Sequence, residues 1–352
     1  MPVLLNPKYP GRERRFGLDW RRLPPGTRRE PRNNVLHIGL VNNMADTAMG
    51  ATEYQFLTLL EAAAGDMQVQ FSLYGLPEVE RKPSGQRRVG SFYFGTDELR
   101  ELPLEQRPDG LIVTGREPRT LDLREESYWS SFQGLLAWTQ EHACSTVWSC
   151  LAAHAAVLAL DGIERVRSQH KHFGIFTCEQ AAPHALLAGA PATLQIPHSR
   201  WNSVSADQLA AKGYQVLTRT SDGGVDTFVK QDAGLFVFFQ GHPEYESEML
   251  MGEYRRDVGR YLRGERETYP LLPRDYFEEE TERSLREIEA RALGSRAPGS
   301  RQELGSRQEK VLEEVSALLS SVRIHNTWRS TAILMYRNWL EHLCWKKSHD
   351  AN

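Results

Sequence analysis

The stretch that most constrains the fold of this chain surrounds Cys150. An apolar, strand-forming segment (STVW, residues 145–148) leads to the cysteine, and an alanine-rich segment of high helix propensity follows as far as Leu160, where Asp161-Gly162 ends it. This pattern predicts a buried strand, a sharp turn and a helix. Such a turn points the thiol away from the sheet, and the helix N-terminus favours a thiolate and offers backbone N–H groups to an oxyanion. Cys150 is therefore either a nucleophile or a small buried apolar side chain, which is the commoner state of a free cysteine.

Segments of the same kind recur along residues 34–276. Near-continuous apolar runs alternate with helical patterns, which predicts an α/β fold: a mostly parallel sheet with helices on both faces. The expected strands, with antiparallel members among the later ones, are 34–41, 69–73, 109–115, 145–148, 173–178, 193–196, 214–219, 227–229 and 235–239. The expected helices are 52–64, a short one from 96, 128–142, 151–160 and 248–262. The polar, basic segment 82–90 is expected to be a mobile loop. In such sheets the chemistry lies beyond the carboxyl ends of the strands, where both Gly115 and Cys150 fall.

The chain is expected to have four parts. Residues 1–33 are Arg-rich and interrupted by Pro and Gly, which indicates a solvated basic arm around the main domain, with a transit peptide as the alternative. Residues 34–276 form the main α/β domain. Residues 277–322 are rich in Glu and Arg and contain a repeated Gly-Ser-Arg, which predicts a charged helical insertion with a flexible middle. Residues 323–352 form a closing C-terminal helix, whose aromatic residues, together with the charged insertion, predict a homodimer.

Charge and cysteine content limit the partners of the chain. A net charge of −3 gives no electrostatic case for nucleic acid. No run is apolar enough for a secretory signal or a membrane span, so no membrane partner is expected. The cysteines do not form a disulfide framework and no pair has zinc-ligand spacing, so no metal is expected and a reducing cytoplasm is the expected location. The four cysteines are Cys144, Cys150, Cys178 and Cys344.

A second stretch, Gly241-His242-Pro243-Glu244, decides between the two interpretations of Cys150. It follows a strongly apolar strand pattern (LFVFF, 235–239) and places a histidine and a glutamate on one turn. A cysteine nucleophile needs an imidazole within hydrogen-bond reach, and the imidazole needs an acceptor that fixes its tautomer. A Gly-His-Pro turn alone often only ends a strand. The cysteine turn and the strand-His-x-Glu turn together are far more specific, and they predict a Cys-His-Glu active site.

These residues resemble the Cys-His-Glu triad of the class I glutamine amidotransferase fold. Within that fold the chain more closely resembles the homoserine O-acyltransferase (homoserine O-succinyltransferase) family of methionine biosynthesis, in stretches that recur in order from about residue 34 onward. These stretches are TEYQ (52–55), DGLIVTG (109–115), YW (128–129), KHFG (171–174), PHSR (197–200), GHPEY (241–245), EYRRD (253–257), TWRS (327–330) and NWL (338–340).

The resemblance implies a mechanism in which an acyl-CoA is a co-substrate. Cys150 takes the acyl group as a thioester, His242 acts as the general base for the thiol and then for the acceptor hydroxyl, and Glu244 orients His242. Backbone N–H groups of Leu151 and of the Gly115-Arg116 turn form the oxyanion hole. No bound metal or redox cofactor is needed.

The resemblance also implies how the substrates are recognised. Lys171, Ser199 and Arg256 match the positions that hold the amino acid, and a guanidinium at Arg256 suits an α-carboxylate. Arg119 matches a position that helps to choose the acyl group, where Glu goes with acetyl and Gly with succinyl. Arg119 is neither, but its charge would attract the free carboxylate of a succinyl group. The resemblance therefore favours succinyl-CoA as donor and L-homoserine as acceptor.

The chain also departs from the family pattern, and alternatives stay open. The usual Cys-Trp-Gly-Ala-Gln is here Cys-Leu-Ala-Ala-His (150–154), and the insertion 277–322 is foreign to the short form of the family. A homoserine O-acetyltransferase, or an enzyme that acylates another hydroxylated amino acid such as serine, is one alternative, because one methylene is worth only about 1–3 kcal/mol of discrimination. A glutamine amidotransferase or hydrolase is another, although that class generally has glycine around its nucleophile (Gly-x-Cys-x-Gly) and Ser149, Ala152 and His154 argue against it. A non-catalytic binding protein has no reason to retain the whole triad.

Overall fold

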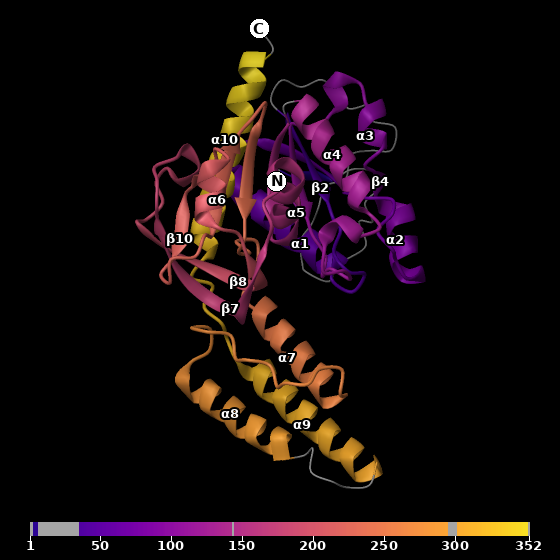
Figure 1. Ribbon diagram of the computed structural model, residues 1–352, viewed down its shortest axis with the longest axis vertical. Helices are drawn as coiled ribbons and strands as arrows, with labels where there is room; N and C mark the ends of the chain where they lie inside the picture. Colours follow the sequence, from indigo (N-terminus) through magenta and orange to yellow (C-terminus); the bar gives the residue numbers. More distant parts are fainter. Residues whose placement is uncertain (1–2, 6–34, 143, 295–300, 351–352) are drawn as a thin grey trace.

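The computed structural model describes residues 3–5, 35–142, 144–294 and 301–350 (Figure 1). Most of the predicted basic arm lies outside these residues, and so do residues 295–300 in the predicted flexible middle of the charged insertion. Within the arm, β1 (Val3–Leu5) is a short strand that pairs in parallel with β3.

Nine strands of the described chain form one sheet. Their order is β1-β3-β2-β5-β6-β12-β11-β9, with β4 beside β3. Neighbours from β1 to β12 are parallel, whereas β11 is antiparallel to both β12 and β9. The sheet therefore confirms the predicted fold class. Its other strands are β2 (Val35–Val41), β3 (Gln68–Gly75), β4 (Phe94–Gly95), β5 (Gly110–Thr114), β6 (Ser145–Ser149), β9 (Gln215–Val216), β11 (Thr227–Gln231) and β12 (Leu235–Phe239).

Helices cover both faces of this sheet (Figure 1). One face packs against α1 (Met49–Ala64) and α10 (Arg329–Asp350), and the other against α4 (Trp129–Glu141) and α5 (Leu151–Asp161). The alternation of side chains along β12 explains why both faces are apolar. Val237 and Phe239 belong to the core on the α1 side, and Phe236 and Phe238 to the core on the α5 side.

The predicted loop over residues 82–90 is wrong, because this segment forms the helix α2 (Pro83–Phe92). Pro83 stands at the first helical turn, where its missing N–H costs nothing. A long-range ion pair also holds the helix: Arg88 donates from Nε to Glu53 Oε1 of α1 at 2.7 Å, and Glu53 is fully buried. Short elements complete the connections: α3 (Glu98–Glu101), α6 (Ala206–Ala211) and the 3-10 turns Leu104–Gln106, Leu123–Glu125 and Ala185–Leu187.

A separate three-stranded antiparallel sheet flanks the main one, in the order β10-β7-β8. Its strands β7 (Val166–Gln180) and β8 (Thr193–Ser203) are longer than the predicted 173–178 and 193–196. The single strand predicted over 214–219 is instead two strands: β9 joins the main sheet and β10 (Thr218–Thr220) joins the small one. The turn from one sheet to the other has no signature in local hydrophobicity, which explains the error.

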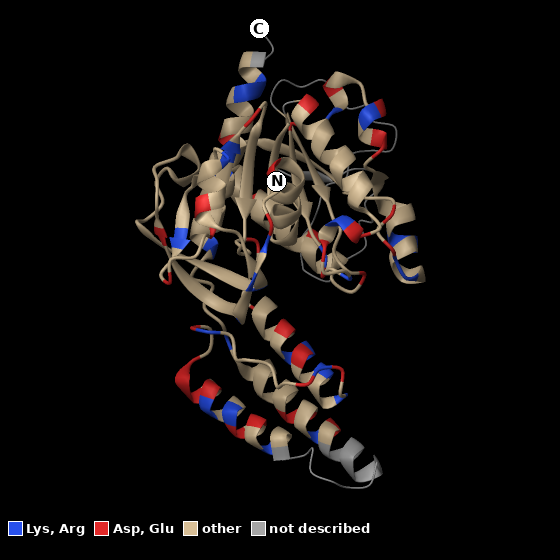
Figure 2. Cartoon of the chain, viewed as in Figure 1, with Lys and Arg blue, Asp and Glu red and all other residues tan. Residues whose placement is uncertain are grey.

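The charged C-terminal segment is helical, as predicted, and it packs on the main domain through an apolar core of its own. The helices α7 (Met249–Leu262), α8 (Glu279–Gly294) and α9 (Arg301–Ser321) lie together at one end of the molecule (Figure 1). Tyr254, Leu285 and Val315 are fully buried between them. Glu and Arg residues are spread along α8 (Figure 2), and the side chains of Glu279, Arg283 and Arg286 are largely exposed. This unit places α7, with its charged residues, beside the end of the small sheet.

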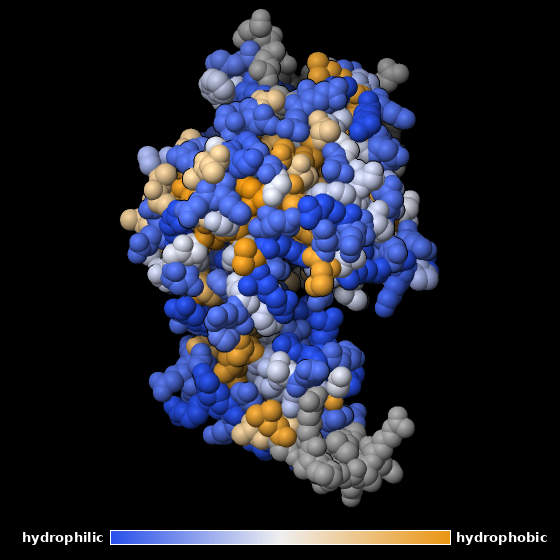
Figure 3. Space-filling view, viewed as in Figure 1, coloured by the Kyte–Doolittle hydropathy of each residue, from blue (hydrophilic) through white to orange (hydrophobic). Residues whose placement is uncertain are grey.

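The closing helix α10 is present as predicted, and its aromatic residues mostly serve the core of their own chain. Tyr336 and Trp339 are buried on the α1 face of the sheet, whereas Trp345 is 60% exposed. The face drawn in Figure 3 is mainly polar, with several separate apolar patches. None of the helices in the described ranges has both the length and the apolar character needed to cross a membrane.

Candidate active site

Cys150 stands at the sharp turn between β6 and α5. Its φ of 51° and ψ of −109° make it one of two non-glycine residues with positive φ in the described part of the chain, Asp275 being the other. The Cys150 N–H donates to Phe239 O at 2.7 Å, and its carbonyl accepts from Ala153 N–H at 3.0 Å. The neighbouring strand and the helix thus hold the cysteine in the strained conformation that a nucleophile elbow requires.

His242 and Glu244 follow β12, the strand that pairs with β6, so the turn after it lies beside the elbow. His242 Nδ1 lies 2.8 Å from Glu244 Oε1, and both side chains are buried. The backbone N–H of His242 donates to Pro197 O at 2.7 Å, and the imidazole stacks on Tyr245 with 4.2 Å between ring centroids. The imidazole is therefore fixed in position, with its other nitrogen left for the thiol.

The electrostatic surroundings of His242 favour its charged form. Burial by itself lowers the pKa of His242, but the negative charges of Cys150 and Glu244 and hydrogen bonds to both raise that pKa well above its usual value. A thiolate next to an imidazolium is the activated form of a cysteine nucleophile. The site is thus arranged to hold the proton of the thiol on His242.

The predicted oxyanion donors lie where two turns meet. A Cβ on Gly115 would lie 2.5 Å from the Cβ of Leu151 and 2.8 Å from the backbone N of Ala152, so the turn after β5 packs directly against the first turn of α5. The first N–H groups of a helix have no partner within the helix and point toward its N-terminal end. Leu151 and Arg116 also line the same cavity as the cysteine.

The three residues predicted to hold the amino acid converge from different elements. The three side chains meet at Glu253 of α7: Lys171 comes from β7, Ser199 from β8 and Arg256 from α7. Glu253 lies in the EYRRD stretch (253–257) but was not among the predicted site residues. Ser199 Oγ donates to Glu253 Oε2 at 2.6 Å, and that oxygen lies 3.6 Å from both Lys171 Nζ and Arg256 Nη2. Asp257 lies 3.1 Å from Arg256 Nε and 3.8 Å from Lys171 Nζ.

This cluster carries both signs of charge, and the pKa values of its two cations shift in opposite directions. Burial lowers the pKa of Lys171 in spite of the nearby carboxylates of Glu253 and Asp257. Burial also acts to lower the pKa of Arg256, but Glu253 and Asp257 more than offset it and raise the pKa overall. An amino acid carries one carboxylate and one ammonium group, so a cluster of this kind offers a partner to each.

A single cavity of about 660 Å³ joins these groups. It contains Cys150, His242 and Glu244 together with the amino-acid cluster and the predicted oxyanion turn. Arg119 is not among the lining residues. Its side chain is 53% exposed and pairs with Glu80, and its backbone N–H donates to Glu126 Oε1 at 2.5 Å. The structure therefore brings together all the predicted site residues except Arg119.

Buried polar residues that the sequence did not single out also line this cavity. Gln55 Nε2 and His154 Nδ1 have no hydrogen-bond partner among the described residues. His154 Nε2 lies 3.0 Å from Gln240 Oε1, and burial, followed by the charge of Arg200, lowers the pKa of His154 to about 3. His154 is thus neutral, with Nδ1 as an acceptor. The only signal in the sequence was that His154 replaces the usual glutamine of the family pattern.

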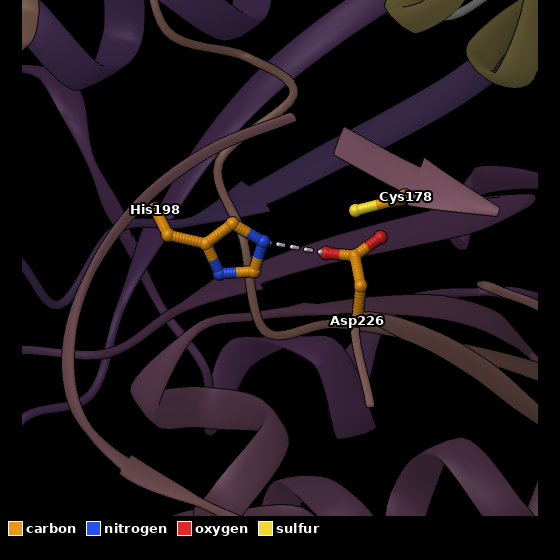
Figure 4. Close-up of side chains that lie close together, drawn as sticks. All are labelled: Cys178, His198 and Asp226. Atoms are coloured by element: carbon orange, nitrogen blue, oxygen red, sulfur yellow. Dashed lines mark ion pairs between the residues drawn. The ribbon is translucent and has the colours of Figure 1, made fainter. Parts of the chain in front are cut away.

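A second buried cluster lies behind the catalytic turn and consists of Cys178, His198 and Asp226 (Figure 4). Their ligand-type atoms lie within 4.8 Å of one another, as in a metal site. However, His198 Nδ1 accepts a hydrogen bond from Arg200 Nε at 3.0 Å, and a guanidinium can only donate. A neutral His198 therefore carries its proton on Nε2, which lies 3.1 Å from Asp226 Oδ1.

The protonation of this cluster also does not suit a metal ion. Burial raises the pKa of Cys178 far above its usual value, which keeps the thiol protonated. Burial lowers the pKa of His198 to about 4, although Asp226 acts in the opposite direction. A metal would need the thiolate and the Nε2 lone pair, and it would have to tolerate the adjacent guanidinium. The donor set fits a buried hydrogen-bond network that holds Arg200.

A parallel sheet whose carboxyl edge bears a cysteine elbow, a buried His-Glu pair and a polar cavity is typical of enzymes that transfer acyl groups through a cysteine. Comparison with known proteins agrees with that class. The model of the homoserine O-succinyltransferase family matches residues 27–349, and the chain belongs to this family. The protein is therefore an acyltransferase enzyme, as the resemblance in the sequence had predicted.

Several similar proteins extend this finding over nearly the whole chain. A homoserine O-succinyltransferase of Rhodopseudomonas palustris is 44% identical over 306 residues, 87% of each chain. One of Bradyrhizobium japonicum is 42% identical over 322 residues, 91% of this chain and 94% of that one. Among solved structures, a glutamine amidotransferase from Methylobacillus flagellatus is similar with a TM-score of 0.47 at 14% identity, covering 88% of this chain and 94% of that one. The fold assignment rests on the strand order rather than on this last score.

Proposed function

We propose that this enzyme transfers the succinyl group of succinyl-CoA to the side-chain hydroxyl of L-homoserine, giving O-succinyl-L-homoserine and CoA, as a step of methionine biosynthesis. The relatives that match nearly the full chain carry the name of this activity. The observation that carries the proposal is the single cavity in which a cysteine elbow and its His-Glu pair face a cluster suited to an amino acid. Both substrates are small molecules, and the reaction requires no prosthetic group or metal.

In the first half-reaction Cys150 becomes acylated. His242 holds the thiol proton, and the thiolate attacks the thioester carbonyl of succinyl-CoA to form a tetrahedral oxyanion. The backbone N–H groups of Leu151 and of the Gly115-Arg116 turn stabilise this oxyanion. Its collapse breaks the bond to the CoA sulfur, which takes the proton from His242, and leaves a succinyl thioester on Cys150.

In the second half-reaction the acyl group passes to the acceptor. His242, now neutral, takes the proton of the homoserine hydroxyl as that oxygen attacks the thioester carbonyl. Collapse of the second tetrahedral intermediate expels the Cys150 thiolate and releases the ester. Glu244 holds Nδ1–H of His242 through both halves, so that the same imidazole nitrogen serves both proton transfers.

The cluster at the end of the small sheet suits the amino-acid part of homoserine. Arg256 offers a bidentate partner to the α-carboxylate, with Lys171 as a second cation, and Glu253 offers an acceptor to the α-ammonium. Ser199 fixes Glu253 by donating a hydrogen bond to Oε2. Replacing homoserine by an alcohol without these two charges removes the partners of the cluster, so such an alcohol should be a poor acceptor.

Arg119 remains the residue that the family resemblance connects with the choice of donor. Because its side chain pairs with Glu80 outside the cavity, a direct contact with a succinyl carboxylate requires this pair to break. Steady-state kinetics with succinyl-CoA and acetyl-CoA on Arg119→Gly and Arg119→Glu test the role. An unchanged donor ratio in Arg119→Glu would remove Arg119 from the account.

The proposed reaction is tested by initial rates with succinyl-CoA and L-homoserine varied together. A double-displacement mechanism gives parallel lines in double-reciprocal plots, and Cys150→Ala should lose essentially all activity. Serine in place of homoserine tests the acceptor, and acetyl-CoA tests the donor. Release of ammonia from glutamine without any acyl transfer would favour the amidotransferase alternative.

We further propose that the enzyme is cytoplasmic and forms a homodimer. A reactive thiol at the elbow requires a reducing compartment, which supports the first point. For the second, α10 still exposes Trp345 beyond the aromatic residues that its own core uses. Light scattering coupled to size-exclusion chromatography would distinguish a dimer from the monomer of 40.1 kDa.

A further inference from the structure

Arg200 is a buried cation in the catalytic cavity that belongs neither to the triad nor to the oxyanion turn nor to the cluster around Glu253. It lies on β8, one residue beyond Ser199, and is only 4% exposed. Its guanidinium donates from Nε to His198 Nδ1 at 3.0 Å and from Nη1 to Asn202 O at 2.7 Å and to Ser203 Oγ. Its third nitrogen, Nη2, is buried and has no hydrogen-bond partner in the described chain. The side chain is therefore rigidly held, with one donor group unused in a cavity that contains Cys150.

The buried network of Figure 4 holds this guanidinium from behind. Asp226 accepts hydrogen bonds from Thr218 Oγ1 at 2.7 Å and Thr227 Oγ1 at 2.8 Å, and it lies against Nε2 of His198. Because Nε2–H of His198 faces Asp226, Nδ1 of His198 accepts the hydrogen bond from Arg200 Nε. The imidazole therefore fixes the guanidinium of Arg200 relative to Asp226. Such a network orients a cation without neutralising it by direct contact.

The charge of Arg200 lacks a carboxylate partner. Among the described residues no carboxylate lies within ion-pair distance of Arg200, whereas Lys171, a partly buried cation of the same cavity, lies near both Glu253 and Asp257. A buried charge without an anion is costly. Burial lowers the pKa of Arg200, whereas the negative charges of Asp226 and then of Cys150 act to raise it. A Cys150 thiolate is therefore an electrostatic partner of Arg200.

Acylation removes that partner, because a thioester sulfur is neutral. An acetyl group leaves the guanidinium without an anion, but a succinyl group brings a new carboxylate three bonds beyond the thioester carbonyl. On the basis of the proposed function, we propose that Arg200 binds the distal carboxylate of the succinyl group in the acyl-enzyme, and that it thereby selects a dicarboxylic acyl donor.

The other cations fit this role less well. Arg119 is outside the cavity. Arg116 and Arg165 line the cavity but are partly exposed, and they bond to loop carbonyls of Glu80 at 3.3 Å and Leu121 at 3.0 Å. Arg200 combines full burial, a fixed guanidinium and an electrostatic link to the nucleophile.

The test compares a donor that carries a distal carboxylate with donors that lack one. We would measure kcat/KM with L-homoserine for succinyl-CoA, for butyryl-CoA, whose chain also has four carbons but ends in a methyl group, and for acetyl-CoA. The proteins are the wild type, Arg200→Gln, Arg200→Lys and, as the matched control, Arg165→Gln, which removes a partly exposed guanidinium from the same cavity. Melting curves of each variant report whether the fold is intact.

Arg200→Gln is expected to lower kcat/KM for succinyl-CoA about 100-fold, with less than about threefold change for butyryl-CoA, because only the first donor loses a charge-assisted hydrogen bond. Arg165→Gln is expected to keep the donor ratio of the wild type. Equal losses for all donors, or none, would overturn the inference while leaving the proposed function intact. A wild type that transfers no acyl group from any donor would overturn both.

Arg200→Lys covers the case in which the neutral variant fails to fold. This variant keeps the buried positive charge but loses the planar guanidinium that can bind a carboxylate through two nitrogens. Its kcat/KM should therefore fall about tenfold more for succinyl-CoA than for butyryl-CoA. An equal loss on the two donors in this variant would also overturn the inference.

Discussion

Replacing Gly115 by alanine tests the oxyanion hole with the smallest perturbation that the chain allows. The added methyl group would lie 2.5 Å from the Cβ of Leu151 and 2.8 Å from the N of Ala152. Nonbonded carbon atoms prefer about 3.5–4.0 Å, so the turn after β5 and the first turn of α5 must separate by about 1 Å. The nearest contacts belong to the backbone and the Cβ of a helical turn, which cannot rotate away as the end of a flexible side chain can.

The expected loss follows from what this separation does to the oxyanion. A donor at about 2.9 Å that moves by about 1 Å no longer makes a hydrogen bond. Loss of one oxyanion donor lowers kcat by about 10²–10³-fold, or about 2.7–4 kcal/mol. The strain itself is expected to cost about 1–3 kcal/mol of unfolding free energy. Gly115→Ala should therefore be a folded protein that forms the thioester about 100-fold more slowly or worse.

The assay is the single-turnover rate of CoA release from succinyl-CoA in the absence of homoserine, together with denaturant unfolding. Gly90→Ala serves as the control, because Gly90 lies in α2 with no neighbouring atom within 4 Å of an added Cβ. This control should keep the wild-type rate and gain about 0.5–1 kcal/mol from helix propensity. A Gly115→Ala variant with a rate within threefold of the wild type would refute the placement of the oxyanion hole.

Three further predictions concern the buried polar groups. In Glu244→Gln the pKa of His242 should fall, because one of the two negative charges that raise it is gone. Turnover should drop about 10³–10⁴-fold, and alkylation of the Cys150 thiol by iodoacetamide at pH 7 should slow; an unchanged alkylation rate would contradict the pairing of His242 with Glu244. Arg88→Ala leaves the fully buried carboxylate of Glu53 without its cation and should cost about 3–5 kcal/mol in denaturant unfolding; a cost below 1 kcal/mol would show that α2 is held otherwise. Burial lowers the pKa of His154 to about 3, so the stability that the neutral imidazole contributes is present above its unfolded pKa of about 6.5 and is lost as the pH falls toward 3. Between pH 7 and pH 5 the free energy of unfolding of His154→Gln should therefore fall by about 2 kcal/mol less than that of the wild type, and an equal fall would contradict the assignment.

Much of the fold could be predicted because it depends on local patterns. The apolar runs that form β2, β5, β6 and β12 are buried on both faces, so each had a strong signal of its own. The cysteine elbow and the His-Glu turn were equally visible, because each lies where a strand pattern stops. The helix α2 was missed because its sequence is polar, and the buried ion pair of Arg88 with Glu53 connects residues 35 positions apart.

The arrangement of the site could be predicted only in part. Ser199 and Glu253 are 54 residues apart, and only the packing of α7 against the small sheet brings them together. The role inferred for Arg200 depends on its contact with His198 on the same strand and, through His198, on Asp226, which directly precedes β11; no pattern in the sequence connects Asp226 with the other two. Arg119 shows the reverse: a matching position in the sequence did not determine where its side chain would lie.

The central claim is that Cys150 carries the acyl group, and intact-protein mass spectrometry after brief mixing with succinyl-CoA tests it most directly. The wild type is expected to carry a succinyl adduct that is absent in Cys150→Ala and that disappears when L-homoserine is added. Full activity with homoserine but no adduct on the wild type under any mixing time, or an adduct that persists in Cys150→Ala, would contradict it.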